Sequence, residues 1–233
     1  MKIAKRLLLI STSILIIIVS TVHATAFITE EVDAETAERV CSNTKISVTQ
    51  QMPDTREIDC FDVNENGWIA LGFTRLGEAT ICIYNEAFEF KYAYTFEQSG
   101  NYGLQWAGSN IYLYTVRGDL QIEVDPAGKI VDVKSIPITE ENRKYWDTVV
   151  YSTKREINGR TYEISKDIGI LSFFSNAYSQ LNVTDSDGNR ICLYNVSRSL
   201  YATTLFRIGM VVIFLGLCAF MAVKLIRSKA REK

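Results

Sequence analysis

Two long apolar segments, one at each end of the chain, constrain its fold more than any other feature of the sequence. The first covers residues 7–28 and follows a short basic stretch, residues 1–6. The second covers residues 205–226 and precedes the basic tail, residues 227–233. Each is long enough to cross the ~30 Å hydrocarbon core of a bilayer as a helix. The sequence therefore favours a membrane segment at both ends, with one domain between them.

The N-terminal segment has two interpretations. Its basic start, its apolar middle and the small residues Ala24-Thr25-Ala26 are typical of a secretory signal peptide that is cleaved before Phe27. Alternatively, the segment remains in the membrane as an uncleaved transmembrane helix. Both interpretations place the following domain outside the cytoplasm.

The charges beside the apolar segments predict the orientation of the chain. Lys and Arg residues that flank membrane helices are retained on the cytoplasmic side. The second segment ends in a basic cluster, formed by Lys224, Arg227, Lys229, Arg231 and Lys233. We therefore expect the C-terminus in the cytoplasm, and the bulk of the chain on the outer side of a cell membrane.

The part of the chain between the two segments is acidic. From Phe27 to Phe206 it contains 16 Lys and Arg residues and 26 Asp and Glu residues, a net charge of −10. A nucleic-acid partner is not expected, because binding phosphates requires a basic surface. The expected partners are the lipid bilayer and another membrane or envelope protein.

Short runs of alternating apolar and polar residues fill the middle domain, residues 45–204, and predict an all-β fold. Turn sequences such as Asn66-Gly67 and Asn158-Gly159 separate the runs, and Asn-Gly between two such runs is a strong signal of a β-hairpin. The expected strands are residues 45–50, 68–73, 80–84, 89–96, 110–116, 120–124, 129–136, 148–157, 160–165, 180–183 and 190–194.

Three segments depart from the β pattern. Residues 29–44 begin with Thr29 as a candidate N-cap and continue with acidic residues and alanines, which favours a short helical stalk. Thr139 is a candidate cap for one helical turn over residues 140–146. Residues 169–178 (GILSFFSNAY) fit either a strand or a helix.

A repeat of about forty residues runs through the β region. Ile69 in NGWIAL corresponds to Ile111 in SNIYLY, and LNVTDSDGNRICLYN follows the same strand–turn–strand plan. This period resembles the blades of WD40- or NHL-like β-propellers. The resemblance covers residues 61–137 and part of residues 160–195, and it implies a propeller-like fold without implying an activity. The alternative is a meander of antiparallel hairpins.

Four cysteines fall in the expected extracytoplasmic part of the chain, namely Cys41, Cys60, Cys82 and Cys192. An even number of cysteines in an oxidising compartment favours disulfides. Among the three possible pairings we expect Cys41 with Cys60 and Cys82 with Cys192. Four buried thiols are the alternative.

A short acidic and amide-rich pattern suggests a cation site. Asp62, Asn64 and Asn66 alternate along the chain before Gly67, as in the first half of a calcium loop, where side-chain oxygens surround the ion. The acidic residue that closes such a loop is missing, because Phe73 occupies its position. An ordinary Asn-Gly turn is the alternative, and no other cofactor is expected.

The residue types present favour binding over catalysis. The only histidine, His23, lies in the first apolar segment, so the domain has no imidazole for a Ser-His-Asp or Cys-His site. We expect a membrane-anchored extracytoplasmic interaction or sensory module without catalytic activity. Two alternatives are a carboxylate-dependent enzyme that acts on cell-envelope glycans and a structural subunit of a membrane complex. Tyr and Trp are numerous enough to line a sugar-binding platform, although such residues on strands more often belong to the core.

Overall fold

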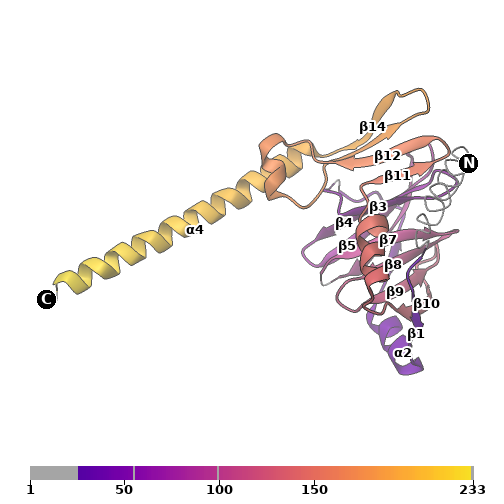
Figure 1. The fold of residues 1–233 in the computed structure, drawn as a ribbon, viewed down its shortest axis with the longest axis horizontal. Coiled ribbons are helices and arrows are strands. Elements are labelled where there is room, and N and C mark those ends of the chain that lie inside the picture. Colours follow the sequence, from indigo (N-terminus) through magenta and orange to yellow (C-terminus); the bar gives the residue numbers. More distant parts are fainter. Residues whose placement is uncertain (1–25, 55, 99, 232–233) are drawn as a thin grey trace, which may run out of the picture.

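Three antiparallel β-sheets and one long C-terminal helix make up the fold (Figure 1). The computed structural model describes residues 26–54, 56–98 and 100–231. The predicted N-terminal membrane helix or signal peptide, with the basic residues before it and His23, lies outside this range apart from its last three residues. The prediction of a β-rich middle domain is confirmed.

Each sheet is a meander of four consecutive strands. The first sheet contains β3 (Cys60–Val63), β4 (Ile69–Arg75), β5 (Glu78–Tyr84) and β6 (Phe90–Glu97). The second contains β7 (Tyr102–Ala107), β8 (Asn110–Thr115), β9 (Leu120–Val124) and β10 (Ile130–Ser135). The third contains β11 (Lys154–Ile157), β12 (Arg160–Ser165), β13 (Gln180–Thr184) and β14 (Arg190–Asn195).

Two short strands from the start of the chain extend these meanders. β1 (Glu30–Glu31) pairs with β10 at the edge of the second sheet, and β2 (Ser47–Thr49) pairs with β6 at the edge of the first. The sheets therefore have five, five and four strands. The meander of antiparallel hairpins is confirmed, and no closed propeller ring is found among the described residues.

The first sheet lies between the other two. One of its faces packs on the third sheet, through side chains that include Phe61, Leu71 and Tyr162. Its other face packs on the second sheet, with Ile81 and Leu104 among the buried residues. Because both faces are covered, β4 and β5 are almost continuously apolar instead of alternating. Figure 1 shows this order of layers, with the third sheet at the top and the second at the bottom.

The predicted turns and strands agree with most of the structure. Asn158 and Gly159 both have positive φ angles, 52° and 72°, as a two-residue Asn-Gly hairpin requires. Each of the eleven expected strands has a counterpart, although the expected strand 148–157 is shortened to β11 because η1 (Trp146–Val150) is a π-helical turn. The sequence did not predict β1, β3 or β7.

Two short α-helices pack on the sheets. α2 (Ala34–Asn43) is capped by Asp33, whose Oδ1 accepts a hydrogen bond from the backbone N–H of Thr36 at 2.8 Å. The expected cap at Thr29 is therefore wrong, and Val40 of this helix packs against the core of the first and second sheets. α3 (Glu140–Tyr145) is capped by Thr139 as predicted. Residues 169–174 form the 3₁₀ helix η2 (Gly169–Phe174).

The expected disulfides are not formed. All the cysteines that the structure describes are free, with Cys60 and Cys82 buried and Cys41 and Cys192 exposed. Each predicted pair would join a buried thiol inside the first sheet to an exposed one on α2 or on the edge strand β14. The structure therefore contains neither predicted pairing, and the residues of each pair lie on different elements in different environments.

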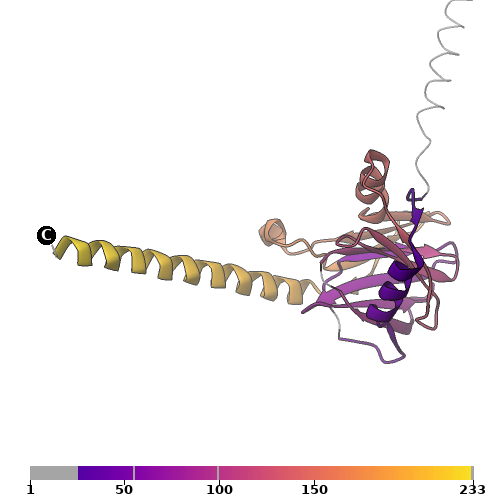
Figure 2. The same cartoon turned by 90° about the horizontal axis from the view of Figure 1, so that it is seen from below.

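α4 (Ser197–Arg231) begins directly after the third sheet and extends away from the domain (Figures 1 and 2). Leu200 and Thr204 in its first turns are buried against the domain. Beyond them large apolar side chains are exposed, and Phe206, for example, is 70% exposed. Residues 197–218 are long and apolar enough to cross a membrane, judged by length and composition. The prediction of a C-terminal apolar helix is confirmed.

Gly72 is expected to be essential for packing between the first two sheets. A Cβ at this position of β4 would lie 2.6 Å from Cys60 Sγ and 2.7 Å from the Tyr102 hydroxyl oxygen. We predict that Gly72→Ala destabilises the domain by about 1–3 kcal/mol, the usual cost of overpacking a core. Chemical denaturation measures the loss. Adding Cys60→Ala, which removes the Sγ, should recover part of it, and a Gly72→Ala variant as stable as the parent would contradict this packing.

Candidate functional site

A cleft opens between the first and second sheets at the end of the strands where their hairpin turns gather. Its volume is about 380 Å³, within the range of small-molecule sites. The walls come from the β3–β4 turn, from β6, from the β7–β8 hairpin and from the β9–β10 turn. The lining residues are Asn64, Asn66, Trp68, Tyr92, Trp106, Gly108, Ser109 and Pro126.

The β3–β4 turn holds one side of the cleft in place. Asn64 Oδ1 accepts hydrogen bonds from the backbone N–H groups of Asn66, at 3.0 Å, and Trp68, at 2.9 Å. A short amide side chain that bonds to the backbone ahead of it is what makes Asn favourable in turns. Gly67 completes the turn with a φ angle of 76°, which other residues rarely adopt. The turn therefore fixes the backbone position from which the Trp68 side chain extends.

Tyr92 forms the part of the wall that comes from β6. Its ring meets the ring of Tyr94 edge to face, with centroids 5.3 Å apart. The Tyr94 hydroxyl donates a hydrogen bond to the carbonyl oxygen of Asp125 at 3.0 Å, which ties the first sheet to the turn that carries Pro126. Burial raises the pKa of Tyr92, so its phenol stays neutral at physiological pH.

Trp106 on β7 is positioned by a buried ion pair. Its backbone N–H donates to Asp62 Oδ2 at 2.8 Å, and Asp62 Oδ1 accepts from Arg155 Nε at 2.5 Å. Arg155 also donates to the carbonyl oxygen of Phe61 at 3.3 Å and lies over the Phe61 ring. Asp62, Arg155 and Trp106 belong to the first, third and second sheets, so this hub joins all three.

The ion pair between Asp62 and Arg155 is largely shielded from solvent. The Asp62 and Arg155 side chains are 8% and 13% exposed. Burial raises the pKa of Asp62, while Arg155 and the Trp106 N–H oppose that rise by stabilising the carboxylate. Breaking such a pair from one side leaves a charge without compensation, which is much more costly than never having the pair.

The residues predicted to bind calcium have separate roles. Asp62 belongs to the hub, the Asn64 oxygen holds the turn, and Asn66 lines the cleft. Both Asp62 oxygens thus have protein donors, and the calcium site stays a prediction. No group of three or more His, Cys, Asp and Glu side chains that could hold a metal ion occurs in the described residues.

A second cavity, of about 290 Å³, lies at the other end of β3. Asp59, Asn101, Tyr151 and Tyr178 contribute polar groups to its lining, together with the Cys60 thiol. Burial raises the pKa of Cys60 well above its ordinary value, so the thiol is protonated and is a poor nucleophile. Phe61, Tyr102, Tyr151 and Tyr178 also line this cavity, but its described lining includes the carboxyl group of Asp59 and holds no tryptophan.

Trp68 and Trp106 are among the cleft residues that motif analysis did not single out. They are far apart in the sequence, and the packing of the first sheet on the second brings them together. The indole Nε1 of Trp106 is buried and has no hydrogen-bond partner among the described residues. A comparison with known proteins found no family model that matches the chain and no matching curated protein.

Proposed function

We propose that this protein is a membrane-tethered extracytoplasmic module that binds a neutral carbohydrate in the cleft of Trp68, Tyr92 and Trp106, without cleaving it. The observation that carries the proposal is the meeting of three aromatic side chains from two sheets in one cleft that also offers amide groups.

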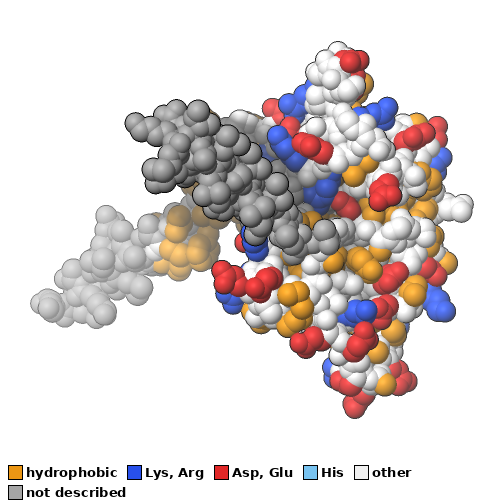
Figure 3. Space-filling model, turned by 45° about the vertical axis from the view of Figure 1, so that its right-hand side comes forward, with side chains coloured by type: hydrophobic (Ala, Val, Ile, Leu, Met, Phe, Trp, Pro, Cys, Tyr) orange, Lys and Arg blue, Asp and Glu red, His pale blue; other side chains and the backbone are white. Residues whose placement is uncertain are grey.

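The tether is supported by α4. Its apolar surface is exposed along much of its length, as expected of a helix that lies among lipid chains. The basic residues of the C-terminal tail favour the cytoplasmic side for that end, which leaves the domain outside. Figure 3 shows acidic and basic side chains mixed over one face of the domain, as suits an aqueous compartment.

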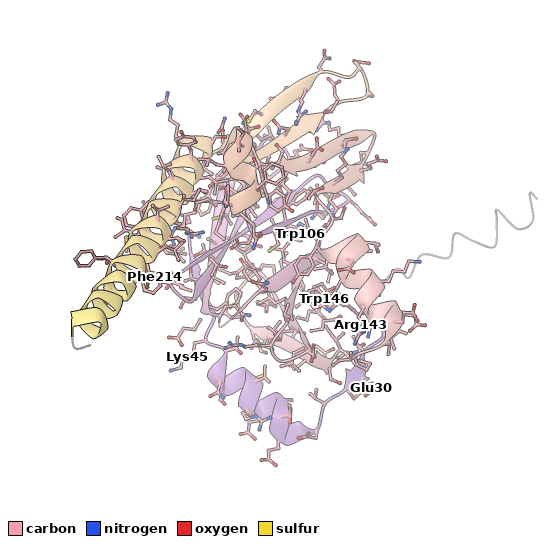
Figure 4. The ribbon with its side chains drawn as sticks, turned by 60° about the vertical axis from the view of Figure 1, so that its left-hand side comes forward. Glu30, Lys45, Trp106, Arg143, Trp146 and Phe214 are labelled. Atoms are coloured by element: carbon pink, nitrogen blue, oxygen red, sulfur yellow. The ribbon has the colours of Figure 1, made fainter. Side chains whose placement is uncertain are left out.

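The cleft lies at the end of the domain opposite the tether. Val196, the residue before α4, donates its N–H to the carbonyl of Ser179, and the neighbouring Tyr178 pairs with Ile58, just before β3 begins. α4 therefore starts where β3 starts. The Asn64–Trp68 turn follows the other end of β3, so the cleft faces away from the membrane and toward the envelope. Figure 4 likewise shows Trp106 well separated from Phe214 of α4.

The chemistry of the cleft suits a sugar. The C–H face of a pyranose ring is apolar and can stack on an aromatic ring, while its hydroxyl groups accept and donate hydrogen bonds. Asn66, which lines the cleft and is exposed, carries a carboxamide that can do both. The described lining residues include no charged side chain, which favours a neutral ligand.

The same lining argues for binding without hydrolysis. Glycosidases place two carboxyl groups about 5–10 Å apart across the scissile bond. No Asp or Glu is among the described lining residues of this cleft, and the nearby Asp62 is engaged by Arg155. The carboxylate-dependent enzyme therefore remains a weaker alternative. A purely structural role is weaker as well, because it does not explain the aromatic cleft.

As part of this proposal we regard the domain as blade-like. The first strands of the three meanders lie together, because β3 contacts both β7 and β11. First strands gathered on a common axis are a feature of propeller blades, and this arrangement supports the resemblance noted in the sequence.

Binding can be tested on the full chain in detergent micelles with cellotetraose and tetra-N-acetylchitotetraose as neutral probes. We expect saturable quenching or a shift of tryptophan fluorescence with at least one probe. Trp106→Ala should weaken that binding by about tenfold, equivalent to ~1.4 kcal/mol, as expected for a central aromatic contact.

Trp146→Phe is the matched control, because Trp146 packs on Phe27 away from the cleft and should not affect binding. Asn66→Ala, an exposed change with little effect on folding, should weaken binding as well. Absence of binding to either sugar, or equal affinities for Trp106→Ala and Trp146→Phe, would refute the proposal.

A further inference from the structure

The short helix η2 exposes a cluster of large apolar side chains. Ile170, Phe173 and Phe174 are 81%, 90% and 63% exposed. Residues 168–176 contain no charged side chain. Contiguous exposed apolar residues of this size are uncommon on a soluble surface and generally mark a contact with a membrane or a partner.

η2 lies beside the point where α4 leaves the domain. The two helices are in contact. Figures 1 and 2, which differ by a 90° rotation, both show η2 next to the first turns of α4 and on the side of the domain from which α4 extends. The exposed apolar side chains of η2 therefore lie on the same side of the domain as α4, whose apolar surface is exposed from Leu205 onward.

The loop that carries η2 is braced against the domain. The Lys166 ammonium group donates to the carbonyl oxygen of Ser175 across the base of the loop. The backbone N–H of Asp167 donates to Ser179 Oγ at 2.9 Å, and Ile168 is buried. These contacts hold both ends of the loop, so the three apolar side chains remain turned outward instead of folding back onto the sheets.

We propose that η2 inserts Ile170, Phe173 and Phe174 into the outer interfacial region of the bilayer beside α4. This inference rests on the proposed membrane tether and adds a second contact that sets the orientation of the domain. The occupant is lipid and not a charged surface, because the apolar cluster is uncharged and the domain carries −10 between Phe27 and Phe206. Such a charge opposes attraction to anionic headgroups, whereas apolar insertion is insensitive to it.

The test places a tryptophan at the apolar tip of the full chain, reconstituted at one copy per nanodisc in phosphatidylcholine. Phe173→Trp is compared with Val131→Trp, a change at another exposed apolar residue, on β10 and away from α4. Both variants keep the same three native tryptophans. We expect a blue-shifted emission for Phe173→Trp and a loss of its emission when the lipid is brominated near the headgroups, with no such loss for Val131→Trp.

The outcomes separate the two proposals. A chain that fails to enter nanodiscs overturns the tether and the inserted helix together. A chain that enters them but shows equal, weak quenching for Phe173→Trp and Val131→Trp overturns insertion of η2 alone. Quenching that requires anionic lipid and disappears at high salt would also overturn it, because the contact would then be electrostatic and not apolar. Because each disc holds one copy, protection by a second chain cannot produce the expected result.

Discussion

Replacing Arg155 with alanine is expected to destabilise the domain by about 3–5 kcal/mol, the typical cost of removing one partner from a buried ion pair. Asp62 would keep a carboxylate that is almost fully buried and has lost its charged partner. The carbonyl of Phe61 would lose a donor at the same time. Because the hub joins three sheets, the loss should appear as one cooperative shift of the denaturation midpoint.

Two companion variants make this prediction specific. Lys154→Ala removes the neighbouring residue, whose exposed pair with Glu163 spans 3.6 Å, and should change stability by only about 0–1 kcal/mol. The double variant Asp62→Leu with Arg155→Met leaves no buried charge and should be more stable than Arg155→Ala. Equal stabilities for Arg155→Ala and Lys154→Ala would show that the hub does not hold the sheets together.

The domain is expected to unfold cooperatively as the pH rises above about 10, the ordinary pKa of tyrosine. Burial raises the pKa of Tyr194 to about 12. It raises the pKa of Tyr84, Tyr94, Tyr102 and Tyr114 further still. Between the two pKa values the unfolded chain releases protons that the folded chain retains, so stability is complete below pH ~10 and falls as the pH rises.

The effect is large because the tyrosines act together. Each unit of pKa difference corresponds to about 1.4 kcal/mol, and several such groups approach the ~5–15 kcal/mol that stabilises an ordinary domain. Tyrosinate absorbance and the circular dichroism of the sheets, recorded in one titration, should therefore change in the same step. Gradual ionisation of these tyrosines in a domain that keeps its sheets would contradict their burial.

The sequence predicts strands well wherever hairpin chemistry and apolar runs coincide. Asn158-Gly159 identifies the β11–β12 hairpin, and β12 itself has the predicted bounds. The sequence did not predict β3 and β7, because both strands contain residues that locally disfavour a strand. β3 has only four residues and includes Asp62, whose burial makes sense only with Arg155, nearly a hundred residues later. β7 contains Gly103 and Gln105, which disfavour a strand when read locally.

Local sequence patterns did not predict the features that depend on how the sheets pack on one another. The even number of cysteines suggested disulfides, but the stacking of the sheets separates exposed Cys41 and Cys192 from buried Cys60 and Cys82. Asn64 and Asn66, which the sequence suggested as calcium ligands, do lie at the candidate site. The nearest available signal for the cleft was Trp68 directly after the Asn66-Gly67 turn; nothing local linked it to Trp106.

The pairing of β1 with β10 has a consequence for how the chain folds. Glu30 pairs in register with Ser135, which lies 105 residues further along the chain, so β1 is synthesised long before its partner strand. β2 is likewise synthesised before its partner strand β6. Contacts this distant in sequence carry a high loop-closure entropy and slow the search for the native state. The N-terminal strands should therefore be the last to gain protection from hydrogen exchange during refolding, after the meanders have stacked.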